Sequence, residues 1–321
     1  MVNKIMAVVL AAGKSTRMKS AKTKVLHQIL GKEIINYLLD SLVACAIAEQ
    51  DIIVVASDNR AAIAGAIKGN VSYALQQEQL GTAHALLAAK EYIAGHNGEL
   101  LVVVGDNPYI TAEALQKLIA HHRQNLAQCT FISAVFPGNP PPYGRVIRNG
   151  QGEVQSIVEE KDASPEQRQI REVNASIYLF DNRVVFPLLA QIDNHNLKKE
   201  YYLTDIIAIL QRKNFKVQAV QADDCAIAIG INTRQDLQEA HDKFNRQIQQ
   251  HLLENGVTIL QPETVTIEHD VEIGRDTVIS PCTYLAAGTC IGINCVIGPF
   301  VYLKNVRVND GEKVIFEKRE A

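Results

Sequence analysis

An apolar residue recurs at every sixth position near the carboxyl end of the chain, and this repeat restricts the fold more than any other feature. Seven aliphatic residues keep the register without a break: Ile267, Ile273, Ile279, Leu285, Ile291, Ile297 and Leu303. Glycine follows directly at Gly274, Gly292 and Gly298. A six-residue apolar repeat is typical of a parallel β-helix, in which one aliphatic side chain per face points inward. The repeat covers about 40 residues, enough for two or three coils with three faces each.

Upstream of the repeat, short apolar runs alternate with stretches of helical periodicity. We expect strands at residues 5–12, 51–56, 71–75, 100–104, 129–136, 173–180, 217–222 and 227–231, and a hairpin at 146–159. We expect helices at residues 34–46, 60–67, 82–93, 111–124, 183–192, 203–213 and for about twenty residues from Thr233. Strands separated by helices of this length indicate βαβ units and a mostly parallel sheet with helices on both faces. The sequence therefore predicts a Rossmann-like α/β domain at residues 1–255 and a short β-helix at 256–321.

The composition excludes several classes of protein. The chain has 321 residues, a formal net charge of −3 and 47% hydrophobic residues, which suits two globular domains and argues against a nucleic-acid or membrane surface. Its six cysteines form no CxxC pair, so zinc-ligand spacing and a compact disulfide framework are both unsupported. No run reaches 18 apolar residues and no signal-peptide pattern is present, so we expect a cytoplasmic protein.

The first apolar run ends in a basic loop that contains glycine. Residues 5–12 read as a buried strand, Gly13 follows it, and Lys14, Arg17 and Lys24 come next. Such a loop is how α/β proteins hold phosphate groups, because backbone N–H groups and positive charge converge beyond the carboxyl end of a strand. Taken alone, the loop is equally well interpreted as an ordinary turn with solvated lysines.

Asp106 is the strongest candidate for a metal ligand. It follows the predicted strand 100–104, at the edge of the sheet where ligand sites of α/β proteins lie. A carboxylate there suits Mg²⁺, which usually binds through one or two carboxylates and substrate phosphates. The alternative is a helix cap, but Thr111 is better placed for that. Asn232, after the predicted strand 227–231, is either a second oxygen ligand or the start of a helix.

Other polar features are ambiguous on their own. Gln76 and Gln79 could read the edge of a base through their amide groups, or could form a polar turn. Glu159 ends a strand, but its charged neighbours are more typical of a solvated face. The sequence shows no Ser/His/Asp or Cys/His arrangement, so we expect no covalent nucleophile from the protein.

Several motifs occur in a family-specific order: LAAGKSTRM, KVLH, LQQEQLGTAHAL, GDNP, YGRVIRN, IVEEKDASPEQRQIREVNASI, EYYLTDII and GINTR. Together they closely resemble the bacterial N-acetylglucosamine-1-phosphate uridyltransferases, within the sugar nucleotidyltransferase superfamily. The resemblance covers residues 4–255 almost continuously and is most specific between residues 143 and 177. It implies a nucleotidyltransferase fold and a left-handed β-helix.

The resemblance also implies roles for individual residues. The nucleotide would be bound by Ala11, Ala12, Gly13, Gln76, Gly81 and Thr82. Arg17 and Lys24 would act in catalysis by neutralising the triphosphate and the developing charge, and Asp106 and Asn232 would bind Mg²⁺. The N-acetylglucosamine moiety would be held by Gly144, Glu159, Asn174 and Tyr202.

The implied reaction is the transfer of UMP from UTP to N-acetylglucosamine 1-phosphate, which gives UDP-N-acetylglucosamine and pyrophosphate. This chemistry needs mainly positioning and charge neutralisation. The alternatives are a nucleotidyltransferase for another hexosamine 1-phosphate or another nucleotide, a catalytically silent binding or regulatory homologue, and a β-helix scaffold. We expect no acetyltransferase activity, because the repeat is much shorter than the tail of the bifunctional relatives. By analogy, the protein would form a homo-oligomer, a trimer; the alternative is that so short a β-helix only caps the first domain.

The chain departs from the family pattern at several positions. Ser15 stands where the superfamily usually has glycine, and Thr23 stands where proline usually precedes the lysine. A serine is less favourable than glycine in a tight loop if its φ is positive. The remaining departures are Ala175 and Ser176 for Thr-Gly, Ile229 for Glu, and Asn107 and Tyr109 for aliphatic residues. These changes leave the identity of the sugar and of the base open.

Overall fold

The structure is a computed structural model that describes residues 4–321, and their internal contacts divide them into two compact units. The first unit holds residues 4–26 and Ile34–Ile231, and the second holds His27–Glu33 and Asn232–Ala321. The division lies upstream of the boundary expected at residue 255, because helix α8 (Arg234–Glu254) belongs to the second unit.

Polar side chains of α8 explain this grouping. The Asn245 Nδ2 and the Gln249 Nε2 each donate to the Val265 carbonyl oxygen at 2.8 Å. The Asn245 Oδ1 in turn accepts from the Ile267 N–H at 3.1 Å. These bonds tie the helix to the start of the hexapeptide repeat, so α8 is structurally part of the unit that carries the repeat.

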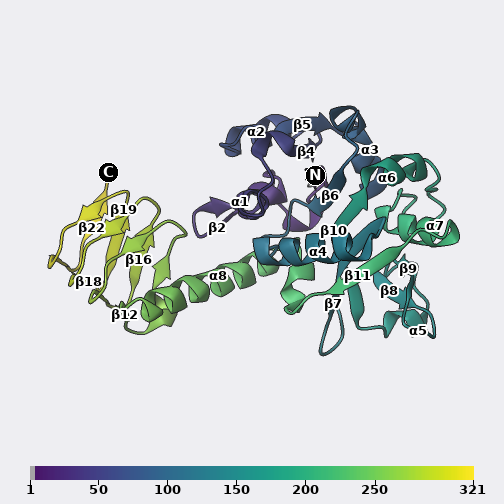
Figure 1. Cartoon of the computed structure of the whole chain (residues 1–321). Helices are drawn as coiled ribbons and strands as arrows, with labels where there is room; N and C mark the ends of the chain where they lie inside the picture. Colours follow the sequence, from purple (N-terminus) through teal and green to yellow (C-terminus); the bar gives the residue numbers. More distant parts are fainter. Residues whose placement is uncertain (1–3) are drawn as a thin grey trace. The chain divides into compact units, whose positions relative to one another are not determined.

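The first unit is built on a mixed, mostly parallel sheet (Figure 1). In the described residues its main path runs β11-β7-β10-β6-β1-β4-β5, with β8 paired to β10 and β9 paired to β8. Strand β10 is antiparallel to β6 and β7, whereas the β1–β4, β1–β6, β4–β5 and β7–β11 pairs are parallel. The strands are β1 (Ile5–Leu10), β4 (Ile52–Ala56), β5 (Ser72–Leu75), β6 (Glu99–Val104), β7 (Cys129–Val135), β8 (Arg145–Arg148), β9 (Val154–Val158), β10 (Glu172–Asp181) and β11 (Val217–Gln221).

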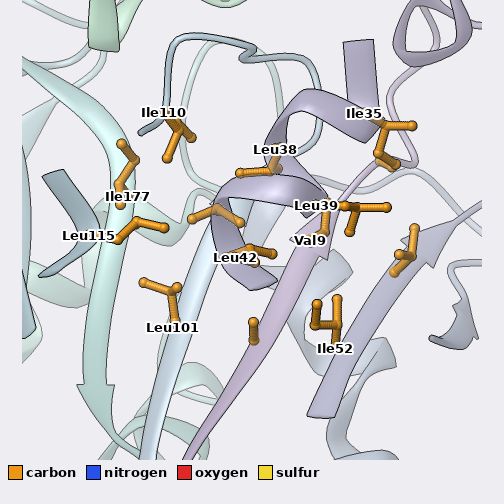
Figure 2. Packing of buried hydrophobic residues seen from close by; sticks show 14 of the residues in the cluster. Val9, Ile35, Leu38, Leu39, Leu42, Ile52, Leu101, Ile110, Leu115 and Ile177 are labelled. Carbon is orange, nitrogen blue, oxygen red and sulfur yellow. The ribbon is translucent and has the colours of Figure 1, made fainter. Parts of the chain in front are cut away.

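Helices cover both faces of this sheet, as expected from the strand–helix alternation. Val9 of β1 belongs to one buried cluster with residues of α1 (Ile34–Ala44), α2 (Arg60–Ala66) and α4 (Ala112–Asn125). Val8 points to the other face and belongs to a second cluster, with residues of α3 (Thr82–Ala88), α6 (Asn182–Leu189) and α7 (Ile206–Arg212). Figure 2 shows Leu38, Leu39 and Leu42 of α1 packed over the strand that carries Val9. The first unit also contains a short helix, α5 (Pro165–Arg168). Among residues 4–321, no helix is both long enough and apolar enough to cross a membrane.

The strand expected at residues 227–231 is not formed, so that prediction was wrong. Cys225–Ala228 is instead a 3₁₀ turn, whose N-cap Asp224 accepts from the Ala226 N–H at 2.9 Å. Ile227 and Ile231 are nevertheless buried, and the Ile231 N–H donates to the Asp106 carbonyl oxygen at 2.8 Å. The apolar run therefore reflects burial without strand pairing.

The second unit contains the short parallel β-helix predicted from the repeat. Its strands visit three parallel sheets in turn, ordered β12-β15-β18-β21, β13-β16-β19-β22 and β14-β17-β20. The register pairs Val278 with Val296 and Tyr284 with Tyr302, so these coils take eighteen residues, or three hexapeptides. The last coil is shorter, since Val296 pairs with Lys313 and Tyr302 with Lys318. Six of the seven repeat residues are buried and Ile273 is partly buried, which confirms the inward-facing pattern.

The β-helix strands are short because each face of a coil is only a few residues wide. They are β12 (Thr258–Ile259), β13 (Thr266–Ile267), β14 (Glu272–Ile273), β15 (Val278–Ile279), β16 (Thr283–Ala286), β17 (Cys290–Ile291), β18 (Val296–Ile297), β19 (Val301–Lys304), β20 (Arg307–Val308), β21 (Lys313–Val314) and β22 (Lys318–Glu320). The same unit includes an unpredicted hairpin of β2 (Gln28–Ile29) and β3 (Lys32–Glu33).

Candidate functional site

A cavity of about 420 Å³ lies in the first unit, beyond the carboxyl ends of the parallel strands β1 and β6. The end of β1 is held in the sheet by the Ala11 N–H, which donates to the Val55 carbonyl at 2.8 Å, and by the Leu10 carbonyl, which accepts from the Gly105 N–H at 2.9 Å. The residues predicted to bind nucleotide all line this cavity, namely Ala11, Ala12, Gly13, Gln76, Gly81 and Thr82. Stretches far apart in sequence thus meet at one sheet edge.

Lys24 and Asp106 lie in the same wall and form an ion pair through Lys24 Nζ and Asp106 Oδ2. Their side chains are only 17% and 13% exposed, so solvent screens the pair weakly. The backbone of Gly230 passes close by, because a Cβ built there would lie 3.1 Å from Asp106 Oδ1. Glycine at residue 230 therefore leaves room for the carboxylate.

The donor set around Asp106 suits a hard cation that is shared with substrate. Residues 4–321 contain no group of three or more His, Cys, Asp or Glu side chains able to hold a metal ion on its own. A single, largely buried carboxylate next to a cavity fits Mg²⁺, which keeps several positions for water and phosphate oxygens. It fits neither zinc nor a calcium cage, which need more protein ligands.

Asn232 is the first residue of the second unit after the division at Ile231. Its N–H donates to Asp236 Oδ2 at 2.8 Å, and Asp236 also closes the capping box of α8 with Thr233. Asn232 therefore precedes the N-cap of α8, which is Thr233. Its assignment as a metal ligand stays a prediction.

The glycine-containing loop presents other charges to the cavity than expected. Lys14 and Thr16 line it, whereas Arg17 is exposed and lies outside the wall that the described residues form. Arg17 belongs to a 3₁₀ turn, Thr16–Met18, which buries Met18 and leaves the arginine facing solvent. The role of Arg17 in catalysis stays a prediction, whereas Lys14, a basic residue of the loop to which the resemblance assigned no role, lines the cavity.

The base-reading candidate Gln76 is buried, 3% exposed, with a fixed amide orientation. Its Nε2 lies 3.2 Å from the Gly81 carbonyl oxygen, an obligatory acceptor, and 3.1 Å from His84 Nδ1. The amide nitrogen is thus committed to the protein. Gly81 has φ 120°, and a Cβ there would lie 2.7 Å from the Tyr201 backbone nitrogen, so only glycine fits.

Besides Lys14 and Thr16, two polar residues to which the resemblance assigns no role also line the cavity, Gln79 and Glu200. Gln79 carried a weak signal, since its motif already suggested contact with a base edge. Glu200 carried no such signal in the sequence, because it lies far along the chain from the other residues of the cavity wall. Only the tertiary pairing of residues 80–83 with Tyr201 brings it to the site.

The residues predicted to hold the sugar form a second cluster in the same unit. The Asn174 N–H donates to the Gly144 carbonyl at 2.9 Å, and the Asn174 Nδ2 donates to the Tyr178 hydroxyl at 2.6 Å. A Cβ at Gly144 would lie 2.8 Å from Ile157 Cγ2 and 3.5 Å from Glu159 Oε1, so Gly144 and Glu159 are close neighbours. The structure therefore brings Gly144, Glu159 and Asn174 together.

Glu159 is partly buried and accepts a hydrogen bond from one neighbouring hydroxyl group. Its Oε1 accepts from the Thr204 hydroxyl at 3.0 Å. Burial raises the pKa of Glu159, and the Thr204 hydrogen bond opposes that rise. Burial and the nearby Glu159 charge raise the pKa of Asp205 to about 6. Two carboxyl groups with raised pKa values thus share this cluster.

Tyr202 carries a polar atom without a partner. The residue is 7% exposed, and its buried hydroxyl has no hydrogen-bond partner among the described residues. Burial is the main cause that raises the pKa of this phenol. A buried hydroxyl that lacks a hydrogen-bond partner is costly, and the role of Tyr202 in sugar binding stays a prediction.

One short segment joins the cavity to this cluster. The Tyr201 N–H donates to the Leu80 carbonyl at 2.7 Å, and the Leu203 N–H donates to the Thr82 hydroxyl at 2.9 Å. The next residue, Thr204, holds Glu159. The segment 200–204 therefore contacts both groups of predicted ligand residues.

Comparisons with known proteins agree with this geometry. A sequence profile of the nucleotidyl transferase family matches residues 6–245. The bifunctional protein GlmU of Brevibacillus brevis is 41% identical over 315 residues, which is 98% of this chain and 68% of that protein. The GlmU proteins of Limosilactobacillus reuteri and Halalkalibacterium halodurans are 39% and 40% identical over 309 and 304 residues, or 96% and 95% of this chain.

This chain spans about two thirds of the length of these relatives, since it covers 67% of the second and 66% of the third. The matches confirm the resemblance that the sequence motifs indicated. The chain therefore belongs to the nucleotidyl transferase family, as a nucleotidyltransferase related to the GlmU proteins.

Proposed function

We propose that the protein transfers UMP from UTP to N-acetylglucosamine 1-phosphate and uses Mg²⁺ to do so. The observation that carries this proposal is the single cavity that gathers the glycine loop, Lys24, Asp106 and the Gln76–Thr82 stretch at the carboxyl edge of the sheet. The resemblance of the sequence motifs to the N-acetylglucosamine-1-phosphate uridyltransferases supports the same substrates. A cytoplasmic location and a homo-oligomeric assembly stay predictions.

The reaction joins two substrates that are both anionic. An oxygen of the sugar 1-phosphate attacks the α-phosphorus of UTP, and the bond from that phosphorus to the β-phosphate oxygen breaks in line, which releases pyrophosphate. Like charges must approach, so the main task of the protein is to hold the substrates in line and neutralise their charge. No covalent protein intermediate is needed.

The residues of this chain divide that task. Lys24 and Lys14 contribute positive charge at the cavity wall, and Gln76, through its amide oxygen, and Gly81 would contact the base. Asp106 would hold the Mg²⁺ ion, which supplies further charge neutralisation on the phosphates when bound. Glu159, Asn174 and Tyr202 would bind hydroxyl and amide groups of the sugar, and the unpartnered Tyr202 hydroxyl supports this role.

The proposed substrates can be tested by a pyrophosphate-release screen. The four ribonucleoside triphosphates are each combined with glucose, glucosamine and N-acetylglucosamine 1-phosphates in the presence of Mg²⁺. We expect release only with UTP and N-acetylglucosamine 1-phosphate. Activity with a different pair, and none with this one, would establish another hexosamine or nucleotide specificity instead.

The metal assignment can be tested with Asp106→Asn, which keeps the size of the side chain and removes its charge. We expect kcat to fall by roughly 10²–10³-fold, with the fold unchanged by circular dichroism. Asp223→Asn is the matched control, because Asp223 is exposed, forms an ion pair with Lys117 and lies outside the cavity wall. Near-normal turnover of Asp106→Asn would remove Asp106 from the metal site.

The expectation that these 321 residues do not acetylate glucosamine 1-phosphate stays a prediction. Incubation with acetyl-CoA and glucosamine 1-phosphate should release no free CoA. Release of CoA would contradict it.

A further inference from the structure

We propose that Ser15 and Thr23 form a hydroxyl clamp that fixes the backbone of Lys24, so that Ser15 is a positioning residue for the Lys24 ammonium group. The Ser15 Oγ accepts from the Lys24 N–H at 2.9 Å and lies 3.4 Å from the Thr23 Oγ1. The same Ser15 hydroxyl donates to the Gly13 carbonyl at 3.3 Å. The clamp thus links the start and the end of the loop that carries Lys24.

The backbone conformation of Ser15 supports a specific role for its side chain. Its φ and ψ are 54° and 21°, in the left-handed region that is unfavourable for a residue with a Cβ. Glycine would adopt this conformation without strain but has no hydroxyl to offer. The hydrogen bonds made by the Ser15 side chain offset the unfavourable backbone.

The hydrogen-bond directions in the clamp are consistent with one another. The single Ser15 hydroxyl proton goes to the Gly13 carbonyl, so the Thr23 hydroxyl donates to Ser15. Thr23 Oγ1 in turn accepts from the Asn59 Nδ2 at 3.1 Å. The Asn59 Oδ1 accepts from the Ser57 N–H at 3.1 Å, which anchors the chain of bonds to the turn after β4.

The clamp acts on Lys24 because that residue begins a 3₁₀ turn, Lys24–Leu26. The amide at the start of such a turn has no carbonyl acceptor within it, and Ser15 supplies the acceptor. With the backbone fixed, the lysine stem runs beside Gly13, where a Cβ would lie 3.9 Å from Lys24 Cε, and its Nζ reaches Asp106. A small displacement of a catalytic charge is costly, so holding this backbone matters for the reaction.

Amide hydrogen exchange tests the clamp without any reference to activity. In Ser15→Gly the left-handed backbone is retained and the acceptor is lost. We expect the Lys24 amide, resolved by electron-transfer fragmentation, to exchange about five- to tenfold faster than in the wild type. The Gly105 amide, bonded to the Leu10 carbonyl, should be unchanged. Equal exchange of Lys24 in both proteins would overturn the clamp.

Steady-state kinetics tests the effect on Lys24, and this arm rests on the proposed function. We expect Ser15→Gly to lower kcat for pyrophosphate release about tenfold while KM for the sugar phosphate stays unchanged. Ser20→Ala is the matched control, because the Ser20 Oγ accepts from the Lys22 N–H at 3.1 Å in the same loop, whereas the Lys24 N–H donates to Ser15. If wild-type protein released no pyrophosphate with any pair, the proposed function would fail while the exchange result would still decide the clamp.

A double-mutant cycle separates a shared clamp from two independent loop contacts. Thr23→Val removes the hydroxyl and keeps the shape, so it should lower kcat less than Ser15→Gly does. Once Ser15 is glycine, Thr23→Val should change kcat and Lys24 exchange by less than twofold. Additive effects of the two substitutions, or a kcat of Ser15→Gly equal to that of the wild type, would overturn the proposal.

Discussion

Asp205 and Glu159 are two carboxyl groups whose pKa values are both raised, chiefly by burial. The Thr204 hydroxyl keeps Glu159 oriented, and the hydroxyl of Tyr202 is unpartnered in the same stretch of chain. A polar cluster that is only partly satisfied is unusual in a folded protein. Its polar groups suit a ligand rich in hydroxyl and amide groups, which agrees with the sugar proposed above.

The pKa of Asp205 has a consequence for stability. Its ordinary value of 3.8 is raised to about 6 in the folded protein, so the folded state keeps this proton at pH values where the unfolded chain releases it. The contribution to stability is fully present below about pH 4 and is lost as the pH rises through about 6. We expect Asp205→Asn to be more stable than wild type at pH 8, by about 1 kcal/mol after allowance for partial solvent exposure, and to match it near pH 4.

The measurement is urea unfolding of both proteins at several pH values. Asp181→Asn is the control of opposite sign, because its hydrogen bond to Arg183 lowers the pKa of Asp181. That variant should be less stable than wild type at neutral pH, and the difference should shrink as the pH falls below about 4. A pH-independent stability difference for Asp205→Asn would contradict the raised pKa.

At the scale of single elements, strand β10 carries an irregularity that the sequence analysis did not predict. The register of its pairing with β7 shifts between Asn174 and Tyr178, and Ser176 has φ 58° within that bulge. The Asn174 Oδ1 accepts from the Ser176 N–H at 3.1 Å. The bulge lies directly beside the buried Asn174, the predicted sugar ligand, and Ser176 is the position at which the family resemblance leads one to expect glycine.

Ser176→Gly should stabilise this strand. Glycine removes the cost of a left-handed backbone, roughly 1–2 kcal/mol, and loses roughly 0.5–1 kcal/mol in unfolded-chain entropy. We expect the free energy of unfolding to rise by about 0.5–1 kcal/mol, measured by urea denaturation. Ser176→Ala keeps the Cβ and should leave stability nearly unchanged, so an equal gain in both variants would show that the serine hydroxyl, rather than the backbone, is the source of strain.

Most elements could be predicted because their apolar spacing directly encodes the faces they bury. Helix α4 begins as expected, with the Thr111 hydroxyl accepting from the Ala114 N–H at 3.2 Å. Residues 227–231 were predicted as a strand because burial alone produces the same apolar run as strand pairing. The hairpin of β2 and β3 was missed because two-residue strands have too few positions to show a period.

Like the secondary structure, the candidate site could be predicted where its residues follow directly from the local sequence pattern. Residues that follow strands in the sequence meet at one sheet edge, so Asp106 and Gly13 could be placed together. Glu200 could not, because it joins the cavity through the pairing of its neighbour Tyr201 with Leu80, more than a hundred residues away. The solvent-facing position of Arg17 depends on a single 3₁₀ turn, which charge and spacing do not reveal.

At the scale of the whole molecule, the hydrophobic cores of the two units are separate. The described residues of the first unit form two clusters, one on each face of its sheet. The third cluster holds only residues of the second unit, from Leu252 to Val314. Because each unit buries its own apolar residues, we expect each to have its own free energy of unfolding.

Two matched core substitutions test this independence. Ile279→Ala in the β-helix and Leu42→Ala in α1 each empty a fully buried site and should each cost about 2–5 kcal/mol. In a urea series followed by hydrogen exchange, Ile279→Ala should lower protection only in peptides of the second unit, residues 27–33 and 232–321, and leave the rate of pyrophosphate release in dilute urea unchanged. Leu42→Ala should lower protection in peptides of residues 34–231. If either substitution lowered protection equally in both units, the chain would unfold as one cooperative body, because separate cores cannot transmit the loss of one buried side chain to the other.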